Sequence, residues 1–208
     1  MKQEVEILVF VGYDRKREWV YDNCIKSLRK FNCRSAPIGS SILDSSIWYR
    51  ERSPKDSTEF SVCRFLVPCL SNFVGWSVFM DDDFIWKVDP MELIQFIDTS
   101  KSVMVCQHNY EPKREKKWGD LTQFKYSKKN WSSLMMFNNS HQDCKKLTSE
   151  YVNSIHPLSL HQFEWTSSYG SIPLEYNHLV GEYDNIENAK ALHYTNGYDN
   201  YQNFVGKP

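Results

Sequence analysis

The sequence lacks a long hydrophobic run, because no apolar stretch approaches the roughly 18 residues that a membrane-spanning helix requires. Its amino terminus, MKQEVEILVF, passes straight into a strand-like run and lacks the longer apolar core of a secretory signal peptide. Together these two absences predict a soluble, cytoplasmic protein without a membrane span.

An excess of charge of either sign is also missing. Lysine and arginine number 25 and aspartate and glutamate number 26, so the formal net charge is −1. A chain without an overall basic field has no general electrostatic attraction for nucleic acid or for anionic membranes. We therefore expect no nucleic-acid partner.

Cysteine motifs for metal binding or redox chemistry are absent as well. The six cysteines are scattered, with no CxxC pair and no histidines at zinc-site spacing. This distribution favours reduced, mostly buried thiols.

Strand-like and helical segments alternate along the chain. The apolar run at residues 6–11, ended by Gly12, is typical of a strand buried on both faces, and residues 18–31 have helical spacing. Residues 35–46 have a loop-like composition. We predict further helices at residues 57–70, 90–99 and 144–155, and further strands at residues 76–80, 102–108, 131–138 and 189–195. Residues 173–180 are predicted to be partly extended. The alternation and the length of 208 residues predict a single α/β domain, residues 1–208.

A run of three carboxylates interrupts this pattern. Asp81, Asp82 and Asp83 directly follow an apolar strand-like run and are followed by another, FIW. Adjacent like charges repel, and burying an unpaired carboxylate is costly. Asp81 and Asp83, one residue apart, can both point at one hard cation such as Mg²⁺ or Mn²⁺ at the end of a strand. The alternative is a solvated acidic turn in which Asp83 or Asp89 caps a helix.

Several short motifs follow one another in an order known from one enzyme group. They are CRF at 63–65, MDDD at 80–83, NWSSLMMFN at 130–138, HQFEW at 161–165, IPLEYN at 172–177 and LHYTNG at 192–197. Their order resembles the GT-A glycosyltransferases, and among them glycosyltransferase family eight, the glycogenin and lipopolysaccharide galactosyltransferase group. Each motif alone is weak, whereas the collinearity covers most of the chain.

The resemblance implies a fold and an activity. The fold would be GT-A, a mostly parallel, Rossmann-like mixed sheet flanked by helices, with a nucleotide-sugar half at residues 1–100 and an acceptor half at residues 101–208. The activity would be metal-dependent transfer of a hexose from a nucleotide sugar, expected to be a UDP-sugar, to a hydroxyl of a glycan or other acceptor. The family retains the anomeric configuration.

The resemblance also implies roles for individual residues. Asp81, Asp83 and His193 would hold Mn²⁺ or Mg²⁺. Arg64 would contact the nucleotide or the aspartates, and Asp82 would contact the donor. The turn after the first strand would hold the base and ribose through Val11, Gly12, Tyr13 and Asp14.

The predicted catalytic residues lie in the HQFEW motif. Gln162 matches the family's glutamine near the reacting anomeric carbon, and Glu164 is a candidate sugar-hydroxyl acceptor or nucleophile. The chain departs from the family here, since His161 and Phe163 replace aspartates. It also lacks a clear Lys-Pro-Trp after His193.

The polar, lysine-rich stretch at residues 111–129 also holds the aromatic residues Trp118, Phe124 and Tyr126. It cannot bury much surface by itself, so we predict a mobile loop or lid. A closing loop can bring basic residues to a departing diphosphate, although a solvated basic face is the alternative. The candidates are Lys113, Arg114, Lys116 and Lys117.

Two other functions remain open from the sequence. Phosphatases of the haloacid dehalogenase type also end a strand in apolar-Asp-x-Asp, but that strand normally comes near the start of the domain. A nucleotide-sugar-binding protein that has lost catalysis would fit the altered residues around Gln162.

Overall fold

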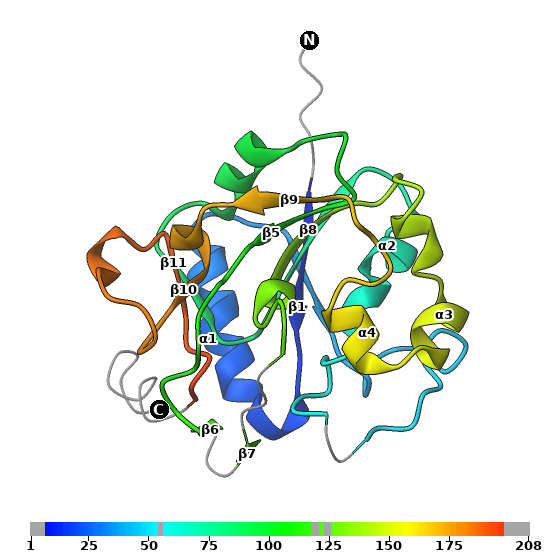
Figure 1. Ribbon diagram of the computed structural model, residues 1–208, viewed down its shortest axis with the longest axis horizontal. Coiled ribbons are helices and arrows are strands. Elements are labelled where there is room, and N and C mark those ends of the chain that lie inside the picture. The colour runs from blue at the N-terminus through cyan, green and yellow to red at the C-terminus, as the bar shows by residue number, and fades with distance from the viewer. Residues whose placement is uncertain (1–6, 54–55, 118–120, 123–125, 198–208) are drawn as a thin grey trace.

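The structure, a computed structural model, describes residues 7–53, 56–117, 121–122 and 126–197. A six-stranded sheet forms its centre, in the order β2-β1-β3-β8-β5-β9. The strands are β1 (Leu8–Gly12), β2 (Ser35–Ile38), β3 (Trp76–Met80), β5 (Val103–Cys106), β8 (Leu134–Asn138) and β9 (Tyr169–Ile172). Strand β8 is antiparallel to both of its neighbours, whereas the other pairs are parallel. The predicted α/β class with a mixed, mostly parallel sheet is confirmed (Figure 1).

Helices cover both faces of this sheet. Helix α1 (Glu18–Arg29) lies on one face, and the short helices α2 (Val67–Leu70), α3 (Ser149–Ser154) and α4 (Pro157–His161) lie on the other (Figure 1). Short 3₁₀ segments occur at Arg15–Arg17, Cys63–Leu66, Pro90–Phe96, Trp131–Ser133, Cys144–Lys146, Leu174–Asn177 and Ile186–Asn188. Within the described residues, no helix is long and apolar enough to cross a membrane.

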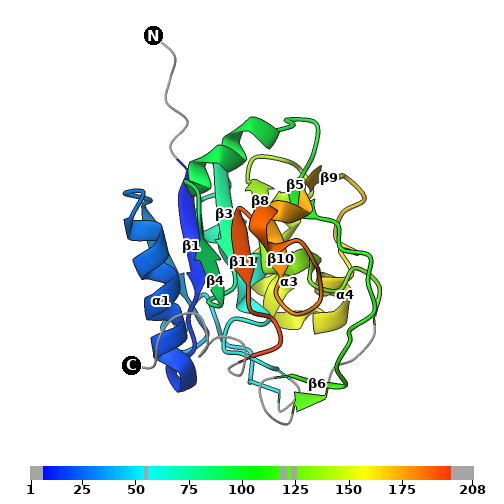
Figure 2. The same ribbon diagram turned by 90° about the vertical axis from the view of Figure 1, so that its left-hand side faces the viewer.

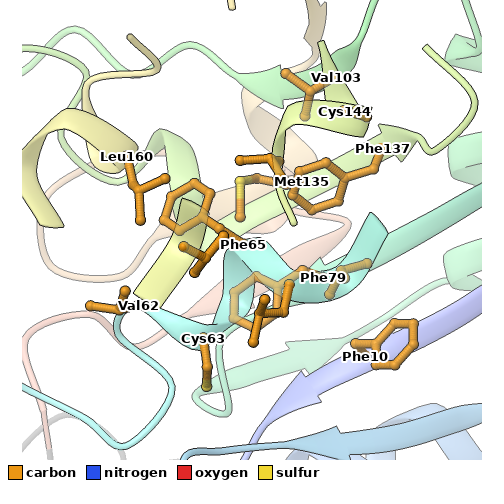
Figure 3. Close-up of a cluster of buried hydrophobic side chains, with 14 of the residues drawn as sticks. Phe10, Val62, Cys63, Phe65, Phe79, Val103, Met135, Phe137, Cys144 and Leu160 are labelled. Atoms are coloured by element: carbon orange, nitrogen blue, oxygen red, sulfur yellow. The ribbon is translucent and has the colours of Figure 1, made fainter. Parts of the chain in front are cut away.

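Two hydrophobic cores lie on opposite sides of the sheet, because successive side chains of a strand point to opposite faces. Phe10 and Phe79 pack in one core with Phe65, which comes from the segment that leads into α2 (Figure 3). Val78, next to Phe79 in β3, packs in the other core with Leu28 of α1. The strands are therefore buried on both faces, as the continuous apolar runs predict.

A second, three-stranded sheet is attached at the end of β3. It consists of β4 (Phe84–Trp86), β11 (Ala191–His193) and β10 (His178–Leu179), with β11 between the other two. Strands β4 and β11 are antiparallel and lie side by side in Figure 2. This pairing places a late segment of the chain directly beside the residues that follow β3. A separate two-stranded ribbon joins β6 (Lys116–Lys117) to β7 (Leu121–Thr122).

Several predicted elements differ in the structure. The helix predicted at residues 57–70 is regular only in α2, after a 3₁₀ segment at Cys63–Leu66. Hydroxyl groups compete with helical hydrogen bonds at its start, where the Thr58 backbone N–H donates to the Ser61 Oγ at 2.9 Å. Residues 35–38, predicted as loop, form β2. Its Pro37 is tolerated because β2 is an edge strand.

The other predicted helices and strands are mostly shorter than expected. Residues 90–99 form 3₁₀ structure at Pro90–Phe96, and residues 144–155 contain α3 after a 3₁₀ segment at Cys144–Lys146. The strand predicted at 131–138 begins only at Leu134, and the segment predicted to be partly extended at 173–180 is extended in β10. Strand β9 and helix α4 were not predicted. The cysteines are free thiols and four of the six are buried, as expected.

A loop at residues 39–53 is held against α3 by one amide side chain. The Asn153 Oδ1 accepts from the backbone N–H groups of Tyr49 at 3.0 Å and Arg50 at 2.8 Å, and its Nδ2 donates to the Ile47 carbonyl at 2.9 Å. Arg50 in turn donates from Nη1 to the Ile155 carbonyl at 2.6 Å, beyond the end of α3. The loop thus depends on contacts to a residue far along the chain.

We expect Asn153→Ala to lower the free energy of unfolding by roughly 1 to 3 kcal/mol, because two backbone N–H groups lose their acceptor in a half-buried site. Urea unfolding followed by circular dichroism measures the change. Asn188→Ala, at an exposed position, is the matched control and should be neutral within about 0.5 kcal/mol. Equal stability of the two variants would show that the loop does not depend on Asn153.

Candidate functional site

The carboxyl ends of β1 and β3 and the start of β8 meet at one edge of the central sheet. In the register Val11 pairs with Met80 and Met80 pairs with Leu134, so Asp81 directly follows this point. The Asp81 backbone N–H donates to the Ser133 carbonyl at 2.9 Å, which continues the ladder by one bond. Ligands of open α/β sheets bind beyond such strand ends. The predicted placement of the acidic residues at the end of a buried strand is therefore correct.

Asp81, Asp83 and His193 converge at this edge. Their ligand atoms all lie within 4.8 Å of one another. The His193 Nε2 is 3.2 Å from the Asp83 Oδ1 and 4.0 Å from the Asp81 Oδ2. Pairing of β4 with β11 produces this arrangement, because it sets His193 opposite Phe84, the residue after Asp83. The three residues that the sequence assigned to a metal are thus brought together.

A hydrogen-bond chain fixes the orientation of the His193 ring. Its Nδ1 is 2.8 Å from the Asn177 Oδ1, and the Asn177 Nδ2 donates to the Ser133 Oγ at 2.9 Å. An amide oxygen only accepts, so the Nδ1 of His193 carries a proton and its Nε2 faces the carboxylates. The ring also stacks on Phe84, with centroids 4.5 Å apart. The donor set of two carboxylate oxygens and one imidazole nitrogen fits Mn²⁺ or Mg²⁺.

Asn177→Leu should weaken Mn²⁺ binding 10- to 100-fold, since it removes the acceptor that fixes the His193 tautomer and ring orientation. Competition of Mn²⁺ against a fluorescent chelator measures the affinity. Asn188→Leu at an exposed position is the control. Unchanged Mn²⁺ affinity in Asn177→Leu, with wild-type stability, would show that Asn177 does not orient a metal ligand.

Arg64 lies against Asp81, which is one of the two alternatives that the resemblance implies for it. Its Nη1 donates to the Asp81 Oδ1 at 2.6 Å and to the Ser132 carbonyl at 2.9 Å. Burial raises the pKa of Asp81, the guanidinium of Arg64 acts in the opposite direction, and the neighbouring Asp83 raises the pKa further. Positive charge at this position therefore favours the ionised forms of Asp81 and Asp83, and a divalent cation would favour them most strongly.

Asp82, the middle carboxylate, has a different environment. Its side chain is fully buried, and the Arg17 Nη2 donates to its Oδ1 at 2.5 Å. Burial acts to lower the pKa of Arg17, but Asp82 and the other surrounding carboxylates outweigh it and raise this pKa, so the pair is ionic. Asp82 is not among the described residues that line the cavity at the triad, and its role in donor binding stays a prediction. Arg17, which does line the cavity, was missed by sequence reasoning.

The cavity at the triad is small and polar. Its volume is about 90 Å³, below the roughly 300 to 1,000 Å³ of typical ligand pockets. Hydroxyl and amide groups from three segments face the triad. They belong to Ser57, Thr58, Ser61, Tyr126, Asn130, Ser132, Ser133 and Thr195. Groups of this kind bind phosphate and sugar oxygens.

The turn after β1 lies beside this cavity without lining it in the described part of the chain. Val11 is fully buried, and a Cβ on Gly12 would lie 2.7 Å from the ring of Phe60. Asp14 is buried and accepts from the Lys16 backbone N–H at 2.9 Å, while Tyr13 donates from its hydroxyl to Glu18 at 3.2 Å. The predicted contacts of Val11, Gly12, Tyr13 and Asp14 with base and ribose stay predictions.

The predicted catalytic residues lie at the end of α4. Neither Gln162 nor Glu164 is among the described residues that line the cavity, whereas His161 is. The His161 Nδ1 is 2.8 Å from the Ser132 Oγ, and the backbone carbonyl of Gln162 accepts from the Lys128 Nζ at 2.9 Å. Glu164 is exposed. In the sequence, His161 was noted only because it replaces an aspartate of the family. The roles of Gln162 and Glu164 stay predictions.

Only part of the predicted lid at residues 111–129 can be placed. Lys113 and Arg114 are exposed, and neither lines the cavity formed by the described residues. The backbone of Lys116 and Lys117 forms β6. Trp118 and Phe124 lie outside the described residues, so the prediction of a lid is not tested.

Comparison with known proteins finds a relative in sequence. The chain is 39% identical over 202 residues to a protein of Arabidopsis thaliana named Protein CDI, and the match covers 91% of this chain and 77% of that protein. No protein-family model matches the sequence.

Solved structures of glycosyltransferases share the fold. The bifunctional glycosyltransferase WbbM matches with a TM-score of 0.59 and 13% identity, over 100% of this chain and 51% of its own. The glycosyltransferase GlyE of Streptococcus pneumoniae matches with a TM-score of 0.54 and 15% identity, over 92% and 55%. The galactosyltransferase LgtC matches with a TM-score of 0.52 and 9% identity, over 90% and 87%. The chain thus spans about half the length of WbbM and GlyE, and the predicted GT-A fold is confirmed.

Proposed function

Because this chain belongs to the family of the Arabidopsis thaliana Protein CDI and has the fold of GT-A glycosyltransferases, we propose that it is a metal-dependent glycosyltransferase. It transfers a hexose from a nucleotide sugar, a UDP-sugar in our proposal, to an acceptor hydroxyl. The fold of its structural neighbours favours glycosyl transfer over the phosphatase alternative.

The convergence of Asp81, Asp83 and His193 at the end of β3 carries this proposal. A divalent cation held there supplies Lewis-acid stabilisation of the diphosphate leaving group. Asn177 holds the His193 ring, and the burial of Asp83 and His193 keeps bulk water from the ligand atoms. Since electrostatic stabilisation is strongest in a site that excludes water, this burial favours catalysis.

Two guanidinium groups complete the electrostatics of the site. Arg17 and Arg64 both line the cavity, and both lie over the ring of Phe60, at 5.4 and 5.2 Å from its centroid. In our proposal they neutralise the carboxylates and offer further N–H donors to the diphosphate oxygens. Retention of configuration, with Gln162 positioning the donor sugar, is part of the same proposal and rests on the resemblance to family eight.

Calorimetric titration of UDP into the purified protein tests the proposal, with Mn²⁺ and again with the metal chelated. We expect binding only with the metal, followed by release of UDP from at least one UDP-hexose. Metal-dependent binding without release or transfer from any donor would favour the alternative of an inactive nucleotide-sugar-binding protein. If neither UDP nor GDP binds under either condition, the glycosyltransferase proposal is wrong.

A further inference from the structure

A second, larger groove adjoins the triad cavity. Its volume is about 600 Å³, within the range of ligand pockets, and the described residues lining it are 109–112, directly beyond β5, together with Tyr126, Ser127 and Lys129. Tyr126 lines both the groove and the triad cavity, so the two spaces meet at this side chain. A molecule in the groove therefore lies next to whatever occupies the cavity.

The side chains of the groove have the chemistry of a saccharide site. Tyr110 and Tyr126 supply aromatic rings, whose faces pack against the apolar C–H faces of sugar rings. Asn109 adds an amide, Glu111 a carboxylate and Lys129 an ammonium group, which together donate to and accept from hydroxyl groups. Among the described lining residues, the one acidic side chain, Glu111, and the one basic side chain, Lys129, balance each other in charge. This balance favours a neutral sugar over a phosphorylated or acidic one.

The wall between groove and cavity is held by direct contacts. The Asn130 Nδ2 donates to the Tyr110 hydroxyl at 2.7 Å, and Asn130 itself lines the triad cavity. The Tyr110 ring also meets Tyr183 edge-on, with centroids 5.8 Å apart. On the cavity side, the Tyr126 ring centroid is 6.4 Å from that of His161. Tyr110 is thus anchored from two sides before any ligand binds, which lowers the entropic cost of binding.

We infer that this groove is the acceptor subsite and that the acceptor is a neutral saccharide, stacked on Tyr110 and Tyr126. The inference rests on the proposed function, because it assigns the second substrate of that reaction. In the transfer, the bond between the anomeric carbon and the diphosphate oxygen breaks and a bond to the acceptor hydroxyl oxygen forms. The hydroxyl proton leaves with the nucleoside diphosphate. The junction at Tyr126 is where these atoms would meet.

Saturation-transfer NMR with the methyl glycosides of glucose, galactose, mannose and xylose tests the assignment, with Mg²⁺ and UDP present. We expect at least one glycoside to receive saturation from the wild-type protein. Tyr110→Ala should reduce that signal at least tenfold, and Glu111→Gln, which preserves the shape of the side chain, should reduce it at least threefold. Tyr49→Ala removes a tyrosine that is 59% exposed and does not line the groove, and it should leave the signal unchanged.

Calorimetry of UDP on the same samples separates this inference from the proposed function. Tyr110→Ala should bind UDP within twofold of wild type, which also shows that the variant is folded. The inference is overturned if wild type binds UDP but none of the glycosides, or if Tyr110→Ala and Glu111→Gln both leave the glycoside signal unchanged. Glycoside binding without UDP binding would support the groove and reject the proposed function. If neither UDP nor any glycoside binds, both the inference and the proposed function are wrong.

Discussion

Asp83→Asn is expected to lower the affinity for UDP in the presence of Mn²⁺ at least ~100-fold, about 2.8 kcal/mol. Asp83 is the more buried of the two candidate carboxylate ligands, so solvent does not compensate for the loss of its charge at the metal. The amide keeps the size of the side chain next to the His193 Nε2, but a neutral oxygen is a much weaker ligand for a hard cation. Calorimetric titration of UDP measures the effect.

Stability measurements show whether this loss belongs to the metal site. Without metal, Asp83→Asn removes a negative charge that lies beside Asp81, so its free energy of unfolding should not fall below that of wild type. Asp22→Asn, on the exposed side of α1, is the control and should bind UDP normally. If Asp83→Asn retains metal-dependent UDP binding, Asp83 is not a ligand and the triad is not the metal site.

Arg17→Met is expected to lower the free energy of unfolding by about 3 to 5 kcal/mol, because it leaves the fully buried Asp82 without its counter-ion. Lys16→Met is the matched control, since Lys16 is exposed and adjacent in sequence, and it should be neutral within about 0.5 kcal/mol. Urea unfolding monitored by tryptophan fluorescence measures both variants.

A double variant separates loss of the ion pair from loss of packing. In Arg17→Met/Asp82→Asn no charge remains buried, so at least half of the lost stability should return. A double variant as unstable as Arg17→Met would mean that the contact of Arg17 with the Phe60 ring, rather than its charge, holds this part of the protein.

The sequence predicted the acidic half of the site from physical argument alone. An apolar run that ends in three carboxylates indicates a buried strand followed by negative charges that need compensation. The structure has β3 at that place. His193 was found only through resemblance, because no local pattern links it to Asp83. Arg17 could not be found, since Arg15, Lys16 and Arg17 are alike in sequence. Only the three-dimensional path of the chain selects Arg17 to face Asp82.

The fold was predicted best where burial is complete. Strands β1 and β5 are formed by apolar residues and glycine, and β3 is apolar apart from Ser77, so all three were recognised from that pattern. Strands β2 and β9 lie at the two edges of the sheet and contain proline and glycine, so their sequences SAPI and YGSI do not have a strand pattern. The long helix expected at residues 57–70 failed for a different reason. At its start, hydrogen bonds of the Ser61 hydroxyl to Thr58 compete with the helical backbone bonds.

The pairing of β4 with β11 also sets an order of events during synthesis. At typical rates the ribosome needs roughly 5 to 20 s to proceed from Asp83 to His193, and during this time the metal site lacks its third ligand. Arg17 and Arg64 both precede the aspartates in the chain, so their positive charges are available as soon as β3 emerges. The nascent protein therefore holds its own counter-ions for the acidic cluster, and it does not depend on a cation before the last strand arrives.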